Sequence, residues 1–283
     1  MKRITLTHRV AAVLVTAFSA SAFADDCAFN AKRDLDVPAA GLSRLTLQTQ
    51  AGDLRIVGVA GLATIELRGK ACASSAEQLE KLQLQHRSGG DRLEVNTIAP
   101  EEMEMKLFGS NYAYIDLEVR MPQALALELT DSSGDIEISD AGAIDLTDSS
   151  GDITIRDPRG DVRVRDTSGD IEIDEAQGNV VVASDSSGDI EIEGARRDVT
   201  VEGDSSGDIE IRKVGGNARV GRDSSGDIRF RGIVGDAEVG IDSSGSIYAD
   251  GVKGNFKVGS KSGGRRGIEY SDIGGKVSLP DHD

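Results

Sequence analysis

Pairs of acidic residues recur at regular spacing along the second half of this 283-residue chain, each as Asp-Ile-Glu or a close variant. Residues two apart on a β-strand point to the same side, so each pair would hold two carboxylates next to each other. Carboxylate oxygens are the ligands that Ca²⁺ prefers, and two carboxyl groups are also the machinery of glycoside hydrolysis. The candidate cation ligands are Asp170, Glu172, Asp189, Glu191, Asp208 and Glu210.

The phrase Asp-Ser-Ser-Gly-Asp-Ile, with small variations, sets this spacing. Its glycines are 17, then 18, then repeatedly 19 residues apart. They are Gly134, Gly151, Gly169, Gly188, Gly207, Gly226 and Gly245. A period this short is typical of a solenoid, whose repeats pack only on their neighbours. The motif also has a structural explanation, because its glycine suits a left-handed or otherwise Cβ-intolerant turn and the preceding Asp-Ser-Ser can cap the turn amides.

Each repeat contains two short segments in which aliphatic and polar residues alternate, for example residues 188–192 and 198–201. This period-two pattern predicts β-strands whose aliphatic side chains face a common core. Two strands and two turns in about 19 residues leave no room for a helix, so equivalent strands must stack in parallel at about 4.8 Å. We therefore predict an all-β fold, a parallel β-helix or β-solenoid with two short strands per coil, right-handed by the crossover rule.

The start of the chain has the layout of a secretory signal peptide. Lys2 and Arg3 precede an apolar run over residues 10–18 and a small-residue ending at Ala24, so residues 1–24 are expected to be cleaved. No other segment is apolar over the length that a membrane span requires. The protein is therefore predicted to be periplasmic, or extracellular at the cell surface.

The mature chain is predicted to form one continuous domain with two parts. Residues 25–130 are expected to contain degenerate β-coils, a short helix at 74–81 and a loop at 99–111. Residues 131–283 are expected to contain the regular coils and a C-terminal cap.

The only two cysteines, Cys27 and Cys72, are predicted to form a disulfide. An oxidising compartment favours this bond over a free thiol or a metal pair. Closing a loop of roughly 46 residues would stabilise the fold by about 4 kcal/mol in the chain-entropy model.

The formal net charge of −17 limits the partners. Nucleic acid and anionic lipid surfaces need a basic patch, which so acidic a chain does not favour. Candidate partners are an envelope or extracellular protein, a glycan, or cations. End-to-end association of two solenoids remains open.

Three features together give the chain a family resemblance: the strand Asp53-Leu54-Arg55-Ile56, the strand from Ile115 that ends Val-Arg-Met-Pro at Pro122, and the repeated Ser-Gly-Asp-Ile-x-Ile steps. The chain resembles the bacterial putative-adhesin family of β-strand-repeat domains, whose function is unknown. The resemblance covers most of the mature chain. It implies a β-helix-like solenoid in an exported protein, and it brings no catalytic residues.

Stacked carboxylates must be stabilised in some way. At 4.8 Å, two of them repel by about 0.9 kcal/mol at the dielectric of water and about 3.5 kcal/mol at an effective value of 20. Bound calcium could offset this repulsion, and so could hydrogen bonds from turn amides to the carboxylates. Sequence alone leaves both open, with no cofactor otherwise expected.

The sequence favours an exported, non-enzymatic structural or binding protein, adhesin-like, with a repetitive acidic face. The alternative is a polysaccharide-active enzyme of the β-helix type, a lyase or glycoside hydrolase. Only His86 and His282 remain after export and the chain has no Trp, which argues against that alternative.

A catalytic site would normally interrupt the repeat. The repeat is interrupted on this face at Arg229, Ser246 and Tyr248, and Arg265 and Arg266 follow. This region is either a functional contact or a C-terminal cap that loses its regularity.

Overall fold

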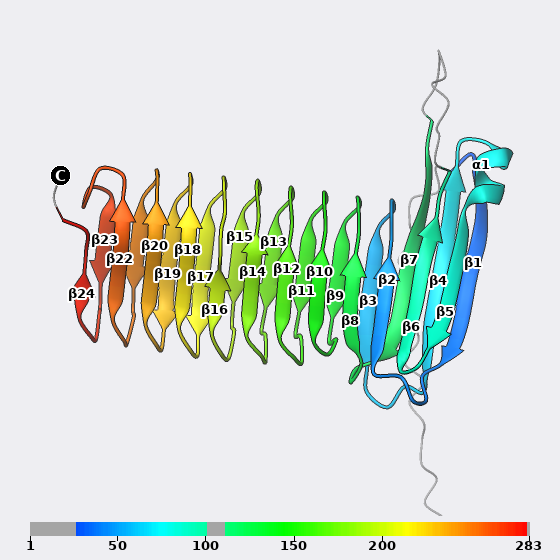
Figure 1. Cartoon of the computed structure of the whole chain (residues 1–283), viewed down its shortest axis with the longest axis horizontal. Coiled ribbons are helices and arrows are strands. Elements are labelled where there is room, and N and C mark those ends of the chain that lie inside the picture. The colour runs from blue at the N-terminus through cyan, green and yellow to red at the C-terminus, as the bar shows by residue number, and fades with distance from the viewer. Residues whose placement is uncertain (1–26, 101–110, 282–283) are drawn as a thin grey trace, which may run out of the picture.

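The computed structural model describes residues 27–100 and 111–281. The predicted signal peptide, most of the predicted loop at 99–111, and His282 lie outside the described residues. Two sheets of 12 strands each face one another along an elongated rod (Figure 1). The predicted all-β parallel solenoid is therefore confirmed.

The first sheet, called sheet A, contains nine parallel strands in its solenoid part. They are β3 (Leu54–Val59), β9 (Ile136–Ser139), β11 (Ile153–Arg156), β13 (Ile171–Asp174), β15 (Ile190–Glu193), β17 (Ile209–Val214), β19 (Ile228–Ile233), β21 (Ile247–Asp250) and β23 (Ile268–Ser271).

The second sheet, called sheet B, is built in the same way from the second strand of each coil. Its parallel strands are β2 (Arg44–Gln48), β8 (Ala126–Thr130), β10 (Ile144–Thr147), β12 (Val162–Arg165), β14 (Val180–Ser184), β16 (Val199–Val201), β18 (Ala218–Asp223), β20 (Ala237–Asp242), β22 (Phe256–Lys261) and β24 (Val277–Ser278).

The register places identical positions of successive coils on top of one another. Ile153 pairs with Ile136 on one side and with Ile171 on the other, and all three are almost completely buried. Each such aliphatic side chain contributes roughly 1.5 to 3 kcal/mol when fully buried. Because the neighbouring coils supply most of that cover, the core is continuous along the rod.

A β-bulge accounts for the last change of the repeat length. The register between β12 and β14 shifts after Val164, whose partner is Val182, so that Arg165 pairs with Ser184 and Ala183 is the extra residue. From this point the motif glycines are 19 residues apart instead of 18.

The N-terminal part departs from a simple continuation of the coils. Strand β1 (Phe29–Pro38) pairs antiparallel with β4 (Thr64–Ala73), and β4 pairs antiparallel with β7 (Ala113–Pro122), which leads into the parallel strands through β3. In sheet B, β5 (Gln83–Gly89) and β6 (Arg92–Ile98) form a hairpin. These antiparallel strands cover the end of the solenoid, where parallel coils would leave open core (Figure 1).

The short helix expected at 74–81 is present as α1 (Ala76–Lys81). Ser75 is its N-cap and accepts a hydrogen bond from the backbone amide of Gln78. Among the described residues, no helix is long and apolar enough to cross a membrane.

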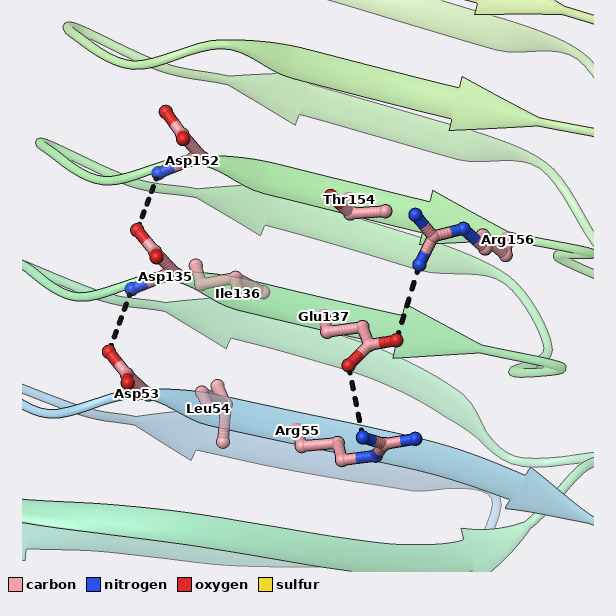
Figure 2. A pocket seen from close by; sticks show the side chains of 9 residues that line it. All are labelled: Asp53, Leu54, Arg55, Asp135, Ile136, Glu137, Asp152, Thr154 and Arg156. Carbon is pink, nitrogen blue, oxygen red and sulfur yellow. Dashed lines mark hydrogen bonds and ion pairs between the residues drawn. The ribbon is translucent and has the colours of Figure 1, made fainter. Parts of the chain in front are cut away.

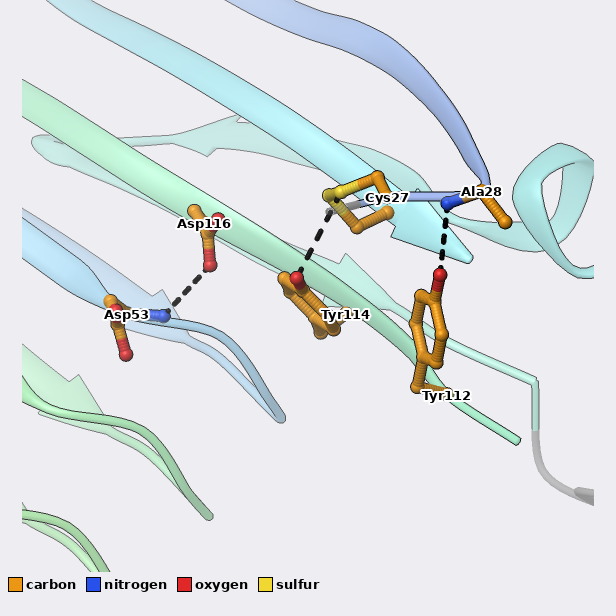
Figure 3. Close-up of a disulfide and its surroundings, with 7 residues drawn as sticks. Cys27, Ala28, Asp53, Tyr112, Tyr114 and Asp116 are labelled. Atoms are coloured by element: carbon orange, nitrogen blue, oxygen red, sulfur yellow. Dashed lines mark hydrogen bonds between the residues drawn. A yellow bond between two sulfur atoms is a disulfide. The ribbon is translucent and has the colours of Figure 1, made fainter. Parts of the chain in front are cut away.

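The predicted disulfide joins Cys27, just before β1, to the buried Cys72 of β4 (Figure 3). The Tyr112 hydroxyl accepts a 2.9 Å hydrogen bond from the amide of Ala28 beside it. The start of the described chain is thereby fixed to the antiparallel strands.

Candidate functional site

The second aspartate of each motif lies at the start of a sheet A strand and forms a ladder along the rod. One carboxylate oxygen of each accepts a hydrogen bond from the backbone amide of the equivalent residue in the next coil, at 2.8 to 3.3 Å. This outer aspartate ladder comprises Asp53, Asp135, Asp152, Asp170, Asp189, Asp208 and Asp227. Figure 2 shows its first three members in a row. Asp116 of β7 begins the series by accepting from the amide of Asp53 at 3.1 Å (Figure 3).

The ladder ends where the sequence predicted an interruption. Ser246 occupies the place of the next aspartate, and its amide donates to Asp227 at 2.8 Å. The hydrogen bond from the Asp227 amide, and then the Arg229 guanidinium, lower the pKa of Asp208. Amide and guanidinium donors thus stabilise ionised carboxylates at this end.

Arginines on the outer face of sheet A pair with the glutamates of the acidic pairs. Glu137 lies between Arg55 at 3.3 Å and Arg156 at 3.2 Å (Figure 2). Arg212 contacts Glu191 and, at 3.6 Å, Glu210. These are half-exposed pairs, each worth little by itself, but together they offset the repulsion along the face.

A second glutamate contact follows the same pattern. Arg231 lies 2.9 Å from Glu210, and Arg156 lies 3.7 Å from Glu172. These arginines stand two residues beyond the acidic pairs, on the same side of their strands. Their position on this face was not predicted from the sequence, although the period-two alternation that places the acidic residues there applies to them equally.

A shallow hollow of about 440 Å³ lies on this face between β3, β9 and β11 (Figure 2). It opens beside Thr154, where several other coils carry a longer glutamate side chain. Asp135 and Glu137 both line it, but the first accepts the Asp152 amide and the second is held by two arginines. Their charges are stabilised as acceptors, which suits a structural role better than proton transfer.

The residues of the C-terminal interruption are only partly brought together. Arg229 lies over the Tyr248 ring at 5.6 Å and pairs with Asp208 and Asp227, each at no more than 2.7 Å. Arg265 instead donates to the Pro280 carbonyl at 3.0 Å, in the terminal segment. Arg229 is therefore part of the ladder's end, and Arg265 holds the C-terminal segment.

The motif glycine and serine both stabilise the backbone of the turn. Gly188 has φ of +128°, and a Cβ there would come within 1.9 Å of the Gly169 carbonyl oxygen in the coil before. The Ser206 hydroxyl donates to the Ser186 carbonyl at 3.0 Å, and the same bond recurs in the other coils. The predicted positive-φ turn role of the glycine is confirmed. The serine differs from the prediction, because its hydroxyl donates to a carbonyl of the preceding coil and does not cap the turn amides.

The first aspartate of each motif was not expected to be buried, and it is. These residues point into a corner of the solenoid with no more than 4% of their surface exposed. We call them the buried aspartate column: Asp131, Asp148, Asp166, Asp185, Asp204, Asp223 and Asp242. Burial raises the pKa of Asp148 and of Asp223 to about 7, and that of Asp185 to about 6; charged neighbours in the column add to the shift.

A sequence signal for this burial was available. The inward alternation of sheet B continues from Leu127 and Leu129 directly to Asp131. The burial was not predicted, because the alternation was expected to end at the last aliphatic residue of the strand.

The six candidate cation ligands are spread along one face. Asp170, Asp189 and Asp208 each accept a backbone amide, and Glu172, Glu191 and Glu210 each lie beside arginines. Within residues 27–100 and 111–281, no group of three or more His, Cys, Asp or Glu side chains is arranged to hold a metal ion.

The family model described as Toastrack DUF4097 matches residues 24–218, well over half of the chain. The chain therefore belongs to this family, which confirms the predicted resemblance to a family of repeat domains of unknown function. A comparison with curated protein sequences found no match.

Solved structures with a similar outline include a putative adhesin from Bacteroides fragilis, at 15% identity and a TM-score of 0.42, covering 89% of this chain and 97% of that one. A putative cell adhesion protein from Clostridium sporogenes has 11% identity and a TM-score of 0.30, with 88% and 99% covered. A putative adhesin from Parabacteroides merdae has 10% identity and a TM-score of 0.32, with 87% and 95% covered. Because these identities and scores are low, we draw no functional conclusion from them.

Proposed function

We propose that this chain is an exported, non-enzymatic structural or binding protein, adhesin-like, which presents the outer face of sheet A to a partner at the cell envelope or outside the cell. The observation that carries the proposal is the use of the repeated carboxylates. The outer aspartates bind amides of the next coil, and the glutamates bind arginines. The motif therefore builds a long, regular charged surface.

Export is supported by two features. The first 24 residues have the pattern of a cleaved signal peptide, and the Cys27–Cys72 disulfide suits an oxidising compartment. Both fit a periplasmic or surface location.

The partner is a protein or glycan that recognises a face with net negative charge. Acidic side chains outnumber the arginines there, because the outer aspartate ladder has no arginine counterpart in most coils. Basic groups or hydroxyl groups on the partner would suit this pattern.

The polysaccharide-active alternative keeps one observation in its favour, the hollow lined by Asp135, Glu137 and Asp152. Turnover of a panel of acidic and neutral polysaccharides tests it. We expect no turnover by the mature protein. Turnover that disappears in Glu137→Gln but persists in the equivalent Glu191→Gln would replace the binding proposal with an enzyme.

Proximity labelling in the native envelope, with the labelling enzyme fused to the C-terminus, would identify neighbours of the protein. We expect a small set of envelope or extracellular molecules enriched over an exported, unfused control. Labelling confined to cytoplasmic proteins would contradict the proposed location.

A further inference from the structure

The buried aspartate column places one carboxyl group per coil in the same interior corner of the rod. Its members stand at the ends of sheet B strands, where parallel stacking brings successive coils about 4.8 Å apart. All seven are at least 96% shielded from solvent, with exposed fractions from 0% for Asp223 to 4% for Asp166. The hydrogen bonds of the outer aspartate ladder do not include these residues.

The column is short of hydrogen-bond donors. In Asp185 and Asp204 one oxygen accepts the amide of the following serine at 2.7 Å, and the second oxygen has no partner. In Asp131, Asp148 and Asp166 neither oxygen has a well-formed hydrogen bond. Burial raises the pKa of all three, and nearby turn amides offset only part of the rise. A buried ionised carboxylate with unpartnered oxygens is strongly disfavoured.

The charged groups around the column are mostly of the same sign. Within the column each aspartate faces another, as Asp148 faces Asp131 and Asp166. Burial raises the pKa of Asp166 and of Asp204, and from the sheet A side Asp152 adds to the first shift and Asp189 to the second.

The two ends of the column differ. At one end burial raises the pKa of Asp131, and the Thr49 side chain facing it offsets part of that rise. At the other end the buried Lys261 lies 2.8 Å from Asp242 and donates to the Gly245 carbonyl at 2.6 Å. Among the described residues, Lys261 is the only cation that forms an ion pair with the column.

We propose that the buried aspartates share protons along the column at neutral pH, so that the solenoid is a pH-responsive rod whose interior becomes more stable as the surroundings acidify. A protonated carboxyl group gains a donor, which it can offer to the carboxylate of the next coil in a hydrogen bond of the usual length of about 2.7 Å. One added proton thus satisfies an unpartnered oxygen and removes a repulsive contact. At the end of the column, the Lys261 ammonium group takes the place of the proton, because it supplies both a donor and a positive charge to Asp242.

The direction of the pH effect follows from the raised pKa values. Unfolded aspartate titrates near pH 4, whereas Asp148 and Asp223 titrate at about 7 and Asp185 at about 6 in the fold. Between these limits the folded chain holds more protons than the unfolded chain. The column's contribution to stability is therefore full below about pH 4 and is lost as pH rises through 6 to 7.

Asparagine substitution tests the proposal because it fixes the neutral state. We expect Asp148→Asn, Asp185→Asn and Asp223→Asn to melt at a higher temperature than the parent at pH 8, by at least ~3 °C each, and the difference to shrink toward pH 5. Asp189→Asn, on the exposed outer ladder, is the matched control, and its difference from the parent should be flat over this range. Column variants that are less stable than the parent by the same amount at both pH values would overturn the proposal.

A measurement on the unmodified mature protein does not depend on any variant folding. Infrared difference spectra between pH 8 and pH 5 should show the carbonyl band of protonated, buried carboxylic acids growing with an apparent midpoint near pH 6 to 7. The Asp148→Asn, Asp185→Asn and Asp223→Asn triple variant, where it folds, should lose most of this band. A parent spectrum with no protonated carboxyl group above pH 5 would overturn the proposal.

Discussion

The carboxylate of Asp189 accepts a 2.8 Å hydrogen bond from the backbone amide of Asp208, its equivalent in the next coil. Asp208 in turn accepts from the amide of Asp227 at 2.8 Å. Each aspartate therefore satisfies the first amide of the following strand and fixes the step between two coils. This relationship explains why an acidic residue recurs on an already acidic chain.

Removing one step of the outer ladder should weaken the fold locally. We expect Asp189→Ala to lower the free energy of unfolding by about 1 to 2 kcal/mol, because the Asp208 amide loses a charged acceptor. Asp189→Asn keeps an acceptor oxygen and should cost less than half as much. Urea unfolding followed by circular dichroism measures both, and equal losses would show that the hydrogen bond is unimportant.

The motif glycine should not tolerate any side chain. A Cβ at Gly188 would lie 1.9 Å from a backbone oxygen at φ of +128°, so Gly188→Ala should destabilise the fold by on the order of 3 kcal/mol. Gly203→Ala is the matched control, since a Cβ there meets nothing within 4 Å. Thermal melts compare the two, and similar melting temperatures would contradict the turn geometry.

The end of the buried column depends on Lys261. The Lys261 side chain is 3% exposed and that of Asp242 is 1% exposed, so Lys261→Met should cost about 3 to 5 kcal/mol by leaving a buried carboxylate unpaired. Adding Asp242→Asn should recover most of the loss. Lys257→Met, which breaks the exposed 2.9 Å pair with Glu238, should cost no more than about 1 kcal/mol. Denaturant titration gives the free energy of unfolding of the parent and of the three variants. A loss in Lys261→Met no larger than the loss in Lys257→Met would show that the buried pair is dispensable.

Calcium should have no effect on stability. The six candidate ligands already bind amides or arginines, so coordination would have to displace these contacts. We expect the same melting temperature in millimolar calcium and in chelator. A rise of several degrees with calcium would indicate a site that binds only the folded state.

The solenoid was predictable because the same short sequence pattern recurs in every coil. The alternation around Ile190 and Ile192 gives the strand, Gly188 marks the turn, and the spacing gives the coil. The hairpin of β5 and β6 was not predicted, because residues 25–130 were interpreted as degenerate copies of the same coil. Gly90, with φ of +62°, and Asp91 form a two-residue turn typical of hairpins.

The charge pattern was harder to predict because it depends on contacts between coils. Arg156 reaches Glu137 in the coil before it, a contact that only the stacked register defines. The burial of Asp148 was not predicted, because an aspartate beside serines is typical of a turn cap. The alternation of Ile144 and Leu146 nevertheless places Asp148 on the inward side.

Binding of the purified mature protein to isolated envelope material tests the central claim most directly. Two triple variants remove the same charge: Glu172→Gln, Glu191→Gln and Glu210→Gln on sheet A, and Glu128→Gln, Glu202→Gln and Glu238→Gln on sheet B. Both sets break half-exposed ion pairs, so both should remain folded. We predict that sedimentation with envelopes is lost in the sheet A variant and kept in the sheet B variant. Equal binding by both variants and the parent would contradict recognition through the outer face of sheet A.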